Sequence, residues 1–229
     1  MTPLELLSHY DSGLPWPVAP SAAAGFDVNA GYQQALAVRA LRLGRGEQPR
    51  GFKIGFTNRS IWARYQVFAP IWGTVWDTTL QVCEGQGRLS LDATCQPRLE
   101  PEVVFGLGRT PPKGADLAAL FDSIDWIAPG FEVVQSHLPD WKFQASDTIA
   151  DSGLHARLLV GRRVPLRAIA ASIGFRDVSF QFEPIAAALD YERSVTSEEI
   201  ALVVDIGGGT ADFSIVRLSP QRHQRADRT

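Results

Sequence analysis

The chain has 229 residues, of which 45% are hydrophobic and 21% are charged, and its formal net charge is -3 at neutral pH. This composition is ordinary for a globular protein with one large domain or two small ones. The slightly negative net charge gives no electrostatic reason to expect nucleic acid or an anionic membrane surface as a partner.

Targeting signals and cysteine content indicate the cellular compartment of the protein. No apolar run approaches the roughly 20 residues that a membrane-spanning helix needs. The N-terminal stretch MTPLELLSHYDSG is acidic and amphipathic, unlike a secretory signal. The 2 cysteines, Cys83 and Cys95, suggest neither a disulfide framework nor a metal-ligand pair. We therefore expect a reduced, cytoplasmic protein.

The N-terminal part predicts two helices separated by a loop. Residues 2–12 suit a short helix, and residues 14–25 hold the prolines and small residues of a connecting loop. A second helix is expected to start with Asp27 or Asn29 as its N-cap and to run to about Leu43.

The next part of the chain changes to short strand-like segments. Strand periods are expected at 51–56, at 70–82 with a break at Gly73, and at 88–94, 95–108 and 130–136. Residues 116–127 have the apolar spacing of a helix. So many short strands with few helices predict a curled or barrel-like sheet rather than a doubly wound one.

From residue 165 the pattern changes again. It predicts a helix at 165–175, a strand at 177–182, a helix at 183–194 and a hairpin whose arms are 200–206 and 213–218.

Three carboxylates occur in otherwise apolar segments with the pattern of β-strands. Glu100 and Glu102 are two residues apart, so on a strand they point to the same face. Glu132 lies in a second such segment, GFEVVQS. Burying three carboxylates together is costly unless a positive charge lies between them, and a hard divalent cation supplies that charge. An alternative stays open, in which Glu100 and Glu102 lie on a solvated edge and Glu132 pairs with a lysine.

Further charged residues occur within strand-like or aromatic text: Lys53, Asp77, Lys142 and Asp147. Taken singly, each is compatible with a structural ion pair or a surface position. Taken together, they make a site more plausible.

These segments, read in order, carry a resemblance to a known family. The texts GFKIGFTN, GTVWDTT, PRLEPEVVFGLG, APGFEVV and LPDWKFQASDTIAD resemble the fumarylacetoacetate hydrolase superfamily, and best its branch of 2-keto-4-pentenoate hydratases and 4-oxalocrotonate decarboxylases. The resemblance covers about residues 1–165. It implies a mixed β-roll that holds Mg²⁺ or Mn²⁺.

The resemblance also implies roles for particular residues. The metal ligands of the family fall on Glu100, Glu102 and Glu132, its catalytic lysine falls on Lys53, and its catalytic aspartate falls on Asp77. Lys142 and Asp147 are then candidate substrate-binding residues. A 2-oxo acid would chelate the metal, which would act as a Lewis acid while water adds to the substrate or CO₂ leaves.

A glycine-rich segment near the C-terminal end carries a second resemblance. DIGGGT allows a backbone to approach phosphate oxygens closely, although such a turn between strands is also a common hairpin. With its flanks, over about residues 170–222, it resembles part of the nucleotide-binding domain of seventy-kilodalton heat-shock chaperones. The second phosphate loop of that family falls on Asp205, Gly207, Gly208, Gly209 and Thr210. Because residues 1–165 contain no first phosphate loop, we expect the segment to be vestigial and to support no ATP hydrolysis.

The sequence therefore predicts an α+β chain made of two joined parts. Residues 1–165 are expected to form an incomplete, C-terminally truncated β-roll of the fumarylacetoacetate hydrolase type. Residues 166–229 are expected to form a small actin-like ATPase fragment of helix, strand, helix and β-hairpin. The function expected is that of a metal-dependent hydratase, a lyase, of a small 2-oxo acid such as 2-keto-4-pentenoate.

Two other functions stay open: a chaperone-like fragment that binds ATP, and a non-catalytic fusion remnant. Sheet edges left uncovered by the truncation would favour pairing with another chain, so a homo-oligomer is one expected outcome.

Overall fold

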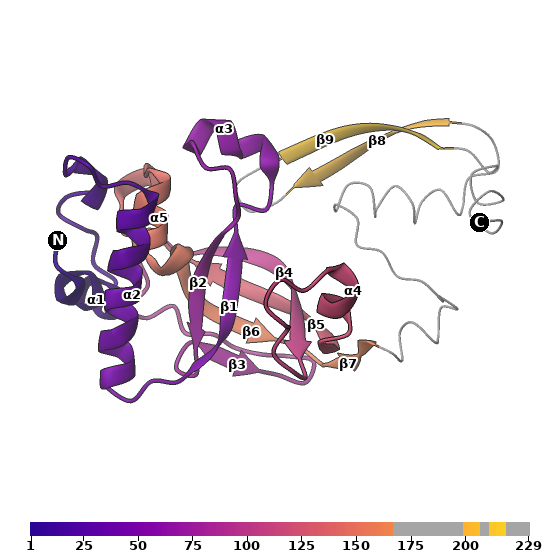
Figure 1. Cartoon of the computed structure of the whole chain (residues 1–229), viewed down its shortest axis with the longest axis horizontal. Coiled ribbons are helices and arrows are strands. Elements are labelled where there is room, and N and C mark those ends of the chain that lie inside the picture. The colour runs from indigo at the N-terminus through magenta and orange to yellow at the C-terminus, as the bar shows by residue number, and fades with distance from the viewer. Residues whose placement is uncertain (167–198, 207–210, 219–229) are drawn as a thin grey trace. The chain divides into compact units, whose positions relative to one another are not determined.

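The computed structural model describes residues 1–166 and the two strands at 199–206 and 211–218 (Figure 1). The chain divides into two compact units, Met1–Leu166 and Arg167–Thr229. The predicted helices and strand between residues 167 and 198, and residues 207–210 of the glycine loop, lie outside the described residues.

The α-helices described in the first unit are α1 (Pro3–Ser12), α2 (Val28–Gly44), α3 (Trp62–Tyr65), α4 (Leu117–Phe121) and α5 (Ala145–Ala150). Of these, α1, α2 and α5 lie together on one side of the unit, whereas α3 and α4 lie apart from them (Figure 1). Short 3₁₀ turns occur at η1 (Pro20–Ala22), η2 (Arg59–Ile61), η3 (Pro139–Trp141) and η4 (Ser152–Leu154). None of the described helices is long and apolar enough to cross a membrane.

Local capping explains why the first two helices form where the sequence predicts. The Thr2 side chain accepts from the backbone N–H of Glu5, and the Glu5 carboxylate accepts from the N–H of Thr2, which closes a capping box. The Asp27 carboxylate caps α2 by accepting from the N–H of Ala30. Both predicted helices are confirmed, with Asp27 rather than Asn29 as the cap.

Strands of the first unit form two sheets. The strands are β1 (Pro49–Gly55), β2 (Ile71–Trp76), β3 (Leu80–Val82), β4 (Arg98–Leu107), β5 (Ile124–Val134), β6 (His155–Val160) and β7 (Val164–Pro165). The antiparallel pair β1–β2 forms the first sheet, and the second has the order β3-β6-β5-β4 with β7 also on β5. Because β3 pairs parallel to β6 while the other pairs are antiparallel, this sheet is mixed.

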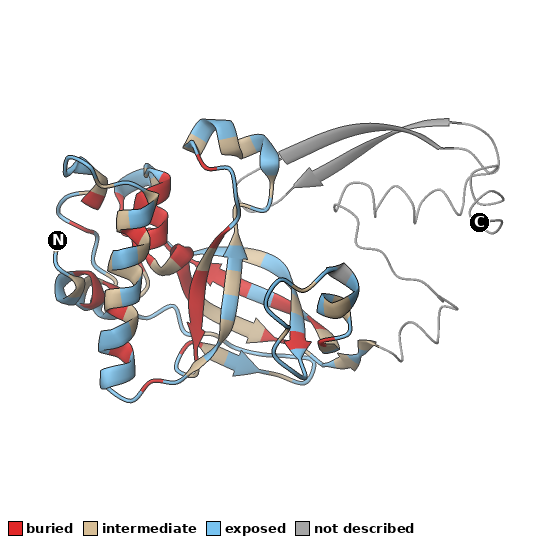
Figure 2. Cartoon of the chain, viewed as in Figure 1, coloured by how far each residue is buried: buried red, intermediate tan, exposed pale blue. Residues whose placement is uncertain are grey.

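The core of the first unit lies where the helices meet the sheets. All six residues of α5, most of β2 and the last residues of β5 are buried (Figure 2). A hydrophobic cluster joins α1, α2 and α5 through Leu6, Leu7, Val38 and Ala150. A row of apolar side chains on β4 and β5 is exposed instead: Leu99, Val103, Phe105, Leu107 and Phe131.

Three local predictions were wrong. Residues 116–127 do not form one helix: α4 ends at Phe121, and β5 begins at Ile124 because it pairs with β4 along its length. Residues 88–94 are not a strand, since Ser90 and Thr94 bond to nearby backbone groups instead. The break in 70–82 falls after Trp76 rather than at Gly73.

The second unit contributes an antiparallel hairpin to the described residues. β8 (Glu199–Ile206) pairs with β9 (Ala211–Leu218), which confirms the predicted arms. Asp205 lies opposite Asp212 in the register, next to the glycine loop.

Candidate metal centre

Three carboxylates converge on the second sheet. The register pairs Glu100 on β4 with Glu132 on β5, and Glu102 lies two residues further along β4. One carboxylate oxygen of each lies within 4.8 Å of those of the other two. Glu132 is buried, Glu100 is half-buried and Glu102 is exposed. The cluster is therefore anchored at a buried end and open to solvent at the other.

A lysine from the first sheet reaches this cluster. Lys53 on β1 places its Nζ 3.0 Å from Oε2 of Glu132, and only 11% of its side chain is exposed. The turn η4 makes room for it, because a Cβ on Gly153 would lie 3.2 Å from Cδ of Lys53. The two interpretations of Glu132 that the sequence left open thus coexist, since it both belongs to the cluster and pairs with a lysine.

Sequence reasoning missed a histidine behind the cluster. His155, the first residue of β6, places its Nδ1 2.8 Å from Oε1 of Glu132. Its Nε2 lies 2.8 Å from Oγ1 of Thr79, and both side chains are buried. The strand β6 has no sequence-based prediction, so no pattern marked His155 as part of a site.

Burial and neighbouring charges set the protonation of these groups. Burial raises the pKa of Glu100, the Lys53 charge lowers it, and the Glu132 charge raises it again, with a net rise. Burial alone would also raise the pKa of Glu132, but the hydrogen bond from His155 and the Lys53 charge hold it below its usual value. Burial lowers the pKa of His155 against the opposing effect of Glu132. Glu132 is therefore ionised next to a neutral imidazole.

This donor set fits a hard divalent cation. Carboxylate oxygens are the preferred protein ligands of magnesium, manganese and calcium. Burial, with a smaller contribution from the Glu132 charge, raises the pKa of Glu100 despite the nearby Lys53 charge, so a bound cation would stabilise the ionised form of the cluster. Glu100, Glu102 and Glu132 are the residues that could hold it.

Asp77 does not join the carboxylate cluster, and its catalytic role stays a prediction. Its Oδ1 accepts from the backbone N–H groups of Gln48 and Thr78, each at 2.9 Å, in the turn after β2. Gln48 is five residues from Lys53, which is about 16 Å along an extended strand. The carboxylate of Asp77 therefore shapes a turn at the far end of the β1–β2 sheet.

Lys142 and Asp147 lie together elsewhere, on an open pocket of about 640 Å³ that aromatic residues also line. Lys142 is exposed and pairs with Asp140 at 3.2 Å. The buried carboxylate of Asp147 accepts from Ser21 N–H, Ser21 O–H and Gln144 N–H at 2.7–2.9 Å. Asp147 thus ties η1 to the start of α5, and the substrate-binding roles of Lys142 and Asp147 stay predictions.

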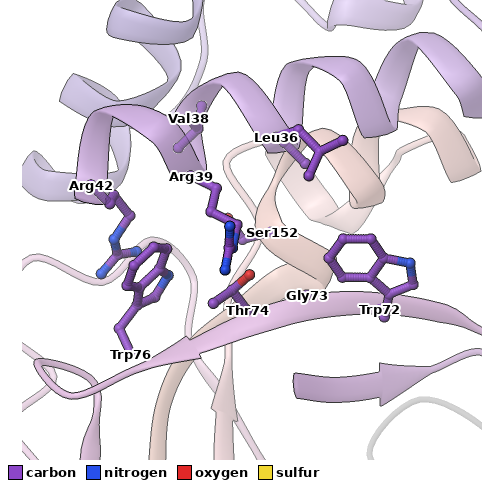
Figure 3. A pocket seen from close by; sticks show the side chains of 10 residues that line it. Leu36, Val38, Arg39, Arg42, Trp72, Gly73, Thr74, Trp76 and Ser152 are labelled. Carbon is purple, nitrogen blue, oxygen red and sulfur yellow. The ribbon is translucent and has the colours of Figure 1, made fainter. Parts of the chain in front are cut away.

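A second concavity lies between α2 and β2 (Figure 3). Its volume of about 10 Å³ leaves space for roughly one water molecule, so it is too small for an organic substrate. Arg42 closes one end, packed over the Trp76 ring at 4.7 Å and paired with Glu47 at 2.6 Å. This buried arginine is structural.

Of the candidate nucleotide residues, Asp205 lies in β8 and the others fall outside the described residues. Gly207, Gly208, Gly209 and Thr210 therefore keep their predicted role in a vestigial phosphate loop as a prediction only.

Comparison with known proteins identifies hydratases and a decarboxylase as relatives. No family model matches the sequence. A 4-oxalocrotonate decarboxylase of Pseudomonas sp is 33% identical over 122 residues, which cover 53% of this chain and 47% of the relative. A 2-hydroxypent-2,4-dienoate hydratase of Pseudomonas putida is 30% identical over 147 residues, covering 63% of this chain and 66% of the relative. The chain thus spans about half to two thirds of the length of these relatives.

A solved structure shares the fold. The 4-oxalocrotonate decarboxylase from Pseudomonas putida G7, complexed with magnesium and adipate, superimposes with a TM-score of 0.60 at 21% identity, covering 73% of this chain and 66% of that one. These comparisons leave the chaperone resemblance of residues 170–222 a prediction. The chain is similar in sequence to hydratases and decarboxylases of the 2-keto-4-pentenoate group, and in fold to 4-oxalocrotonate decarboxylase.

Proposed function

We propose that this protein is a metal-dependent hydratase, a lyase, whose site takes Mg²⁺ or Mn²⁺ and a small 2-oxo acid such as 2-keto-4-pentenoate. The observation that carries this proposal is the cluster of Glu100, Glu102 and Glu132, with Lys53 in contact. The named relatives and the magnesium in the similar solved structure support it.

The residues of the candidate site would have different roles in the reaction. A bound divalent cation supplies Lewis acidity toward the carboxylate and keto oxygens of a 2-oxo acid. Glu100, Glu102 and Glu132 would hold the cation. The ammonium group of Lys53 already contacts the cluster through Glu132. It would attract the substrate carboxylate and stabilise negative charge that develops on the substrate.

The exposed side of the cluster, at Glu102, gives a substrate access, while the buried side at Glu132 excludes water. Decarboxylation of a related 2-oxo acid is the second candidate, because one relative is a decarboxylase and both reactions need charge stabilisation at the same keto oxygen.

The metal site is tested by calorimetry. We expect the unaltered chain to bind Mn²⁺. Glu100→Gln together with Glu102→Gln should abolish this binding, because two of three anionic ligands are lost. Glu84→Gln together with Asp122→Asn removes two exposed carboxylates outside the cluster and should leave binding unchanged. Equal Mn²⁺ affinity in all three proteins would refute the assignment.

The reaction is tested with substrate. Conversion of 2-keto-4-pentenoate with Mg²⁺, followed by ultraviolet absorbance, should be lost in the double glutamine variant. Stabilisation by Mg²⁺ plus oxalate in thermal melts would show an assembled site even if turnover is absent. Absence of both effects would favour the non-catalytic remnant.

We further propose that a hydratase-like part (1–165) is joined to a chaperone-like part (166–229). The division of the chain at Leu166 and the β8–β9 hairpin support this proposal. We expect no ATP hydrolysis, and phosphate release from ATP that is lost in Asp205→Ala would contradict that expectation.

A further inference from the structure

The two oxygens of Glu132 have different partners. Oε1 lies 2.8 Å from Nδ1 of His155, and Oε2 lies 3.0 Å from Nζ of Lys53. The carboxyl group of a glutamate rotates over a broad range about its last torsion when nothing restrains it. In this chain a hydrogen bond on one oxygen therefore decides where the other oxygen points.

His155 is itself held on its opposite side. Its Nε2 lies 2.8 Å from Oγ1 of Thr79, which also accepts from the backbone N–H of Trp76 at 3.1 Å. Because the ionised Glu132 carboxylate can only accept, Nδ1 carries the proton and donates to it, and Nε2 of the neutral ring accepts from the Thr79 hydroxyl, which also lies 3.2 Å from the Trp76 carbonyl oxygen. The imidazole ring is buried, so water does not compete for either bond.

The backbone before His155 also fixes its direction. Ser152, Gly153 and Leu154 all adopt left-handed conformations, with φ of 56°, 67° and 67°. Such conformations are unfavourable for serine and leucine and persist where surrounding packing imposes them. This turn delivers His155 to the start of β6 with its ring toward β5.

We propose that His155 is a positioning residue for cation binding: by holding Oε1, it fixes the orientation of the Glu132 carboxyl group within the cluster that Glu132 forms with Glu100 and Glu102. The inference rests on the proposed metal site. Hydrogen bonds that orient a ligating carboxylate commonly change metal affinity by about 10- to 100-fold when they are removed. Thr79 supports the same arrangement by holding Nε2 on the opposite side of the ring.

The chain offers a matched control in His137. This histidine is also buried, and its Nδ1 lies 2.7 Å from Oδ1 of Asp151, which is not part of the carboxylate cluster. Loss of His137 and loss of His155 each remove a buried imidazole bonded to a carboxylate. A general effect of destabilisation would appear in both variants, whereas an effect on cation binding should appear in one.

The test measures the Mn²⁺ dissociation constant by calorimetry at fixed pH. We expect His155→Leu to weaken binding by about 10- to 100-fold and His137→Leu to leave it unchanged. His155→Asn should restore most of the affinity, because its amide nitrogen takes the place of Nδ1. His155→Gln should not, because its amide nitrogen lies one bond further out.

Each outcome decides between the proposals. Equal Mn²⁺ affinity in the unaltered chain, His155→Leu and His155→Gln would overturn the positioning role and leave the metal site standing. Absence of Mn²⁺ binding in the unaltered chain would overturn the metal site itself, and the positioning role with it. If His155→Leu does not fold, the asparagine and glutamine variants decide, and equal affinities in these two would refute the proposal.

Discussion

Lys53→Met removes the positive charge from the carboxylate cluster and keeps most of the apolar stem. The Nζ–Oε2 distance to Glu132 is 3.0 Å, with side chains 11% and 4% exposed. At this separation the attraction is about 5 kcal/mol for an effective dielectric constant near 20, before the cost of desolvation is subtracted. Removing one partner of a buried pair costs about 3–5 kcal/mol, and the partial exposure of Lys53 places this pair near the lower end.

A loss of about 3 kcal/mol lowers the melting temperature of a unit of this size by roughly 6–12 °C. The assay is thermal melting in EDTA, followed by circular dichroism. Lys142→Met is the control, because Lys142 also pairs with a carboxylate, that of Asp140, but its side chain is 81% exposed. An exposed pair contributes little, so its removal should shift the melting temperature by less than about 2 °C.

Divalent cations should reverse the effect. With Lys53 absent, Mg²⁺ no longer competes with the ammonium group for Oε2, so excess Mg²⁺ should stabilise Lys53→Met more than the unaltered chain. Saturation to 100 times the dissociation constant adds about 2.7 kcal/mol. A melting temperature of Lys53→Met in EDTA that equals that of Lys142→Met would refute the reasoning that Lys53 is the counter-ion of the cluster.

Two further predictions concern the scaffold. Gly73→Ala should destabilise the first unit severely, because the new Cβ would overlap the Ser152 carbonyl. Gly51→Ala is the control, because its Cβ meets no neighbouring atom, and this variant should melt close to the unaltered chain. Equal melting temperatures of the two variants would contradict the close approach of Gly73 to Ser152. Burial lowers the pKa of His137, but the Asp151 charge and hydrogen bond outweigh it, so the net shift is upward. The stabilisation from this rise is complete below the pKa of the unfolded state, about 6.5, and is lost as pH rises through the higher folded pKa. Asp151→Asn should therefore lose more unfolding free energy at pH 6 than at pH 9 in urea titrations, and an equal loss at both would count against a charged pair.

Local signals were predictable because they act over a few residues. The caps Thr2 and Asp27 fix the starts of α1 and α2, and the predicted hairpin arms on either side of the glycine loop are observed as β8 and β9. By contrast, the apolar spacing after Asp116 favoured a helix through residue 127, and the pairing of β5 with β4 overrode it.

The sequence by itself determined the residue types of the candidate centre and part of its geometry. Glu100 and Glu102 share a strand face because side chains on a strand repeat every two residues. The contacts of Lys53 and His155 with Glu132 could not be predicted from the text around them, because these residues come from β1, β6 and β5. Only the register of the strands and the packing of the two sheets decide which distant side chains meet, and they left Asp77 outside the cluster.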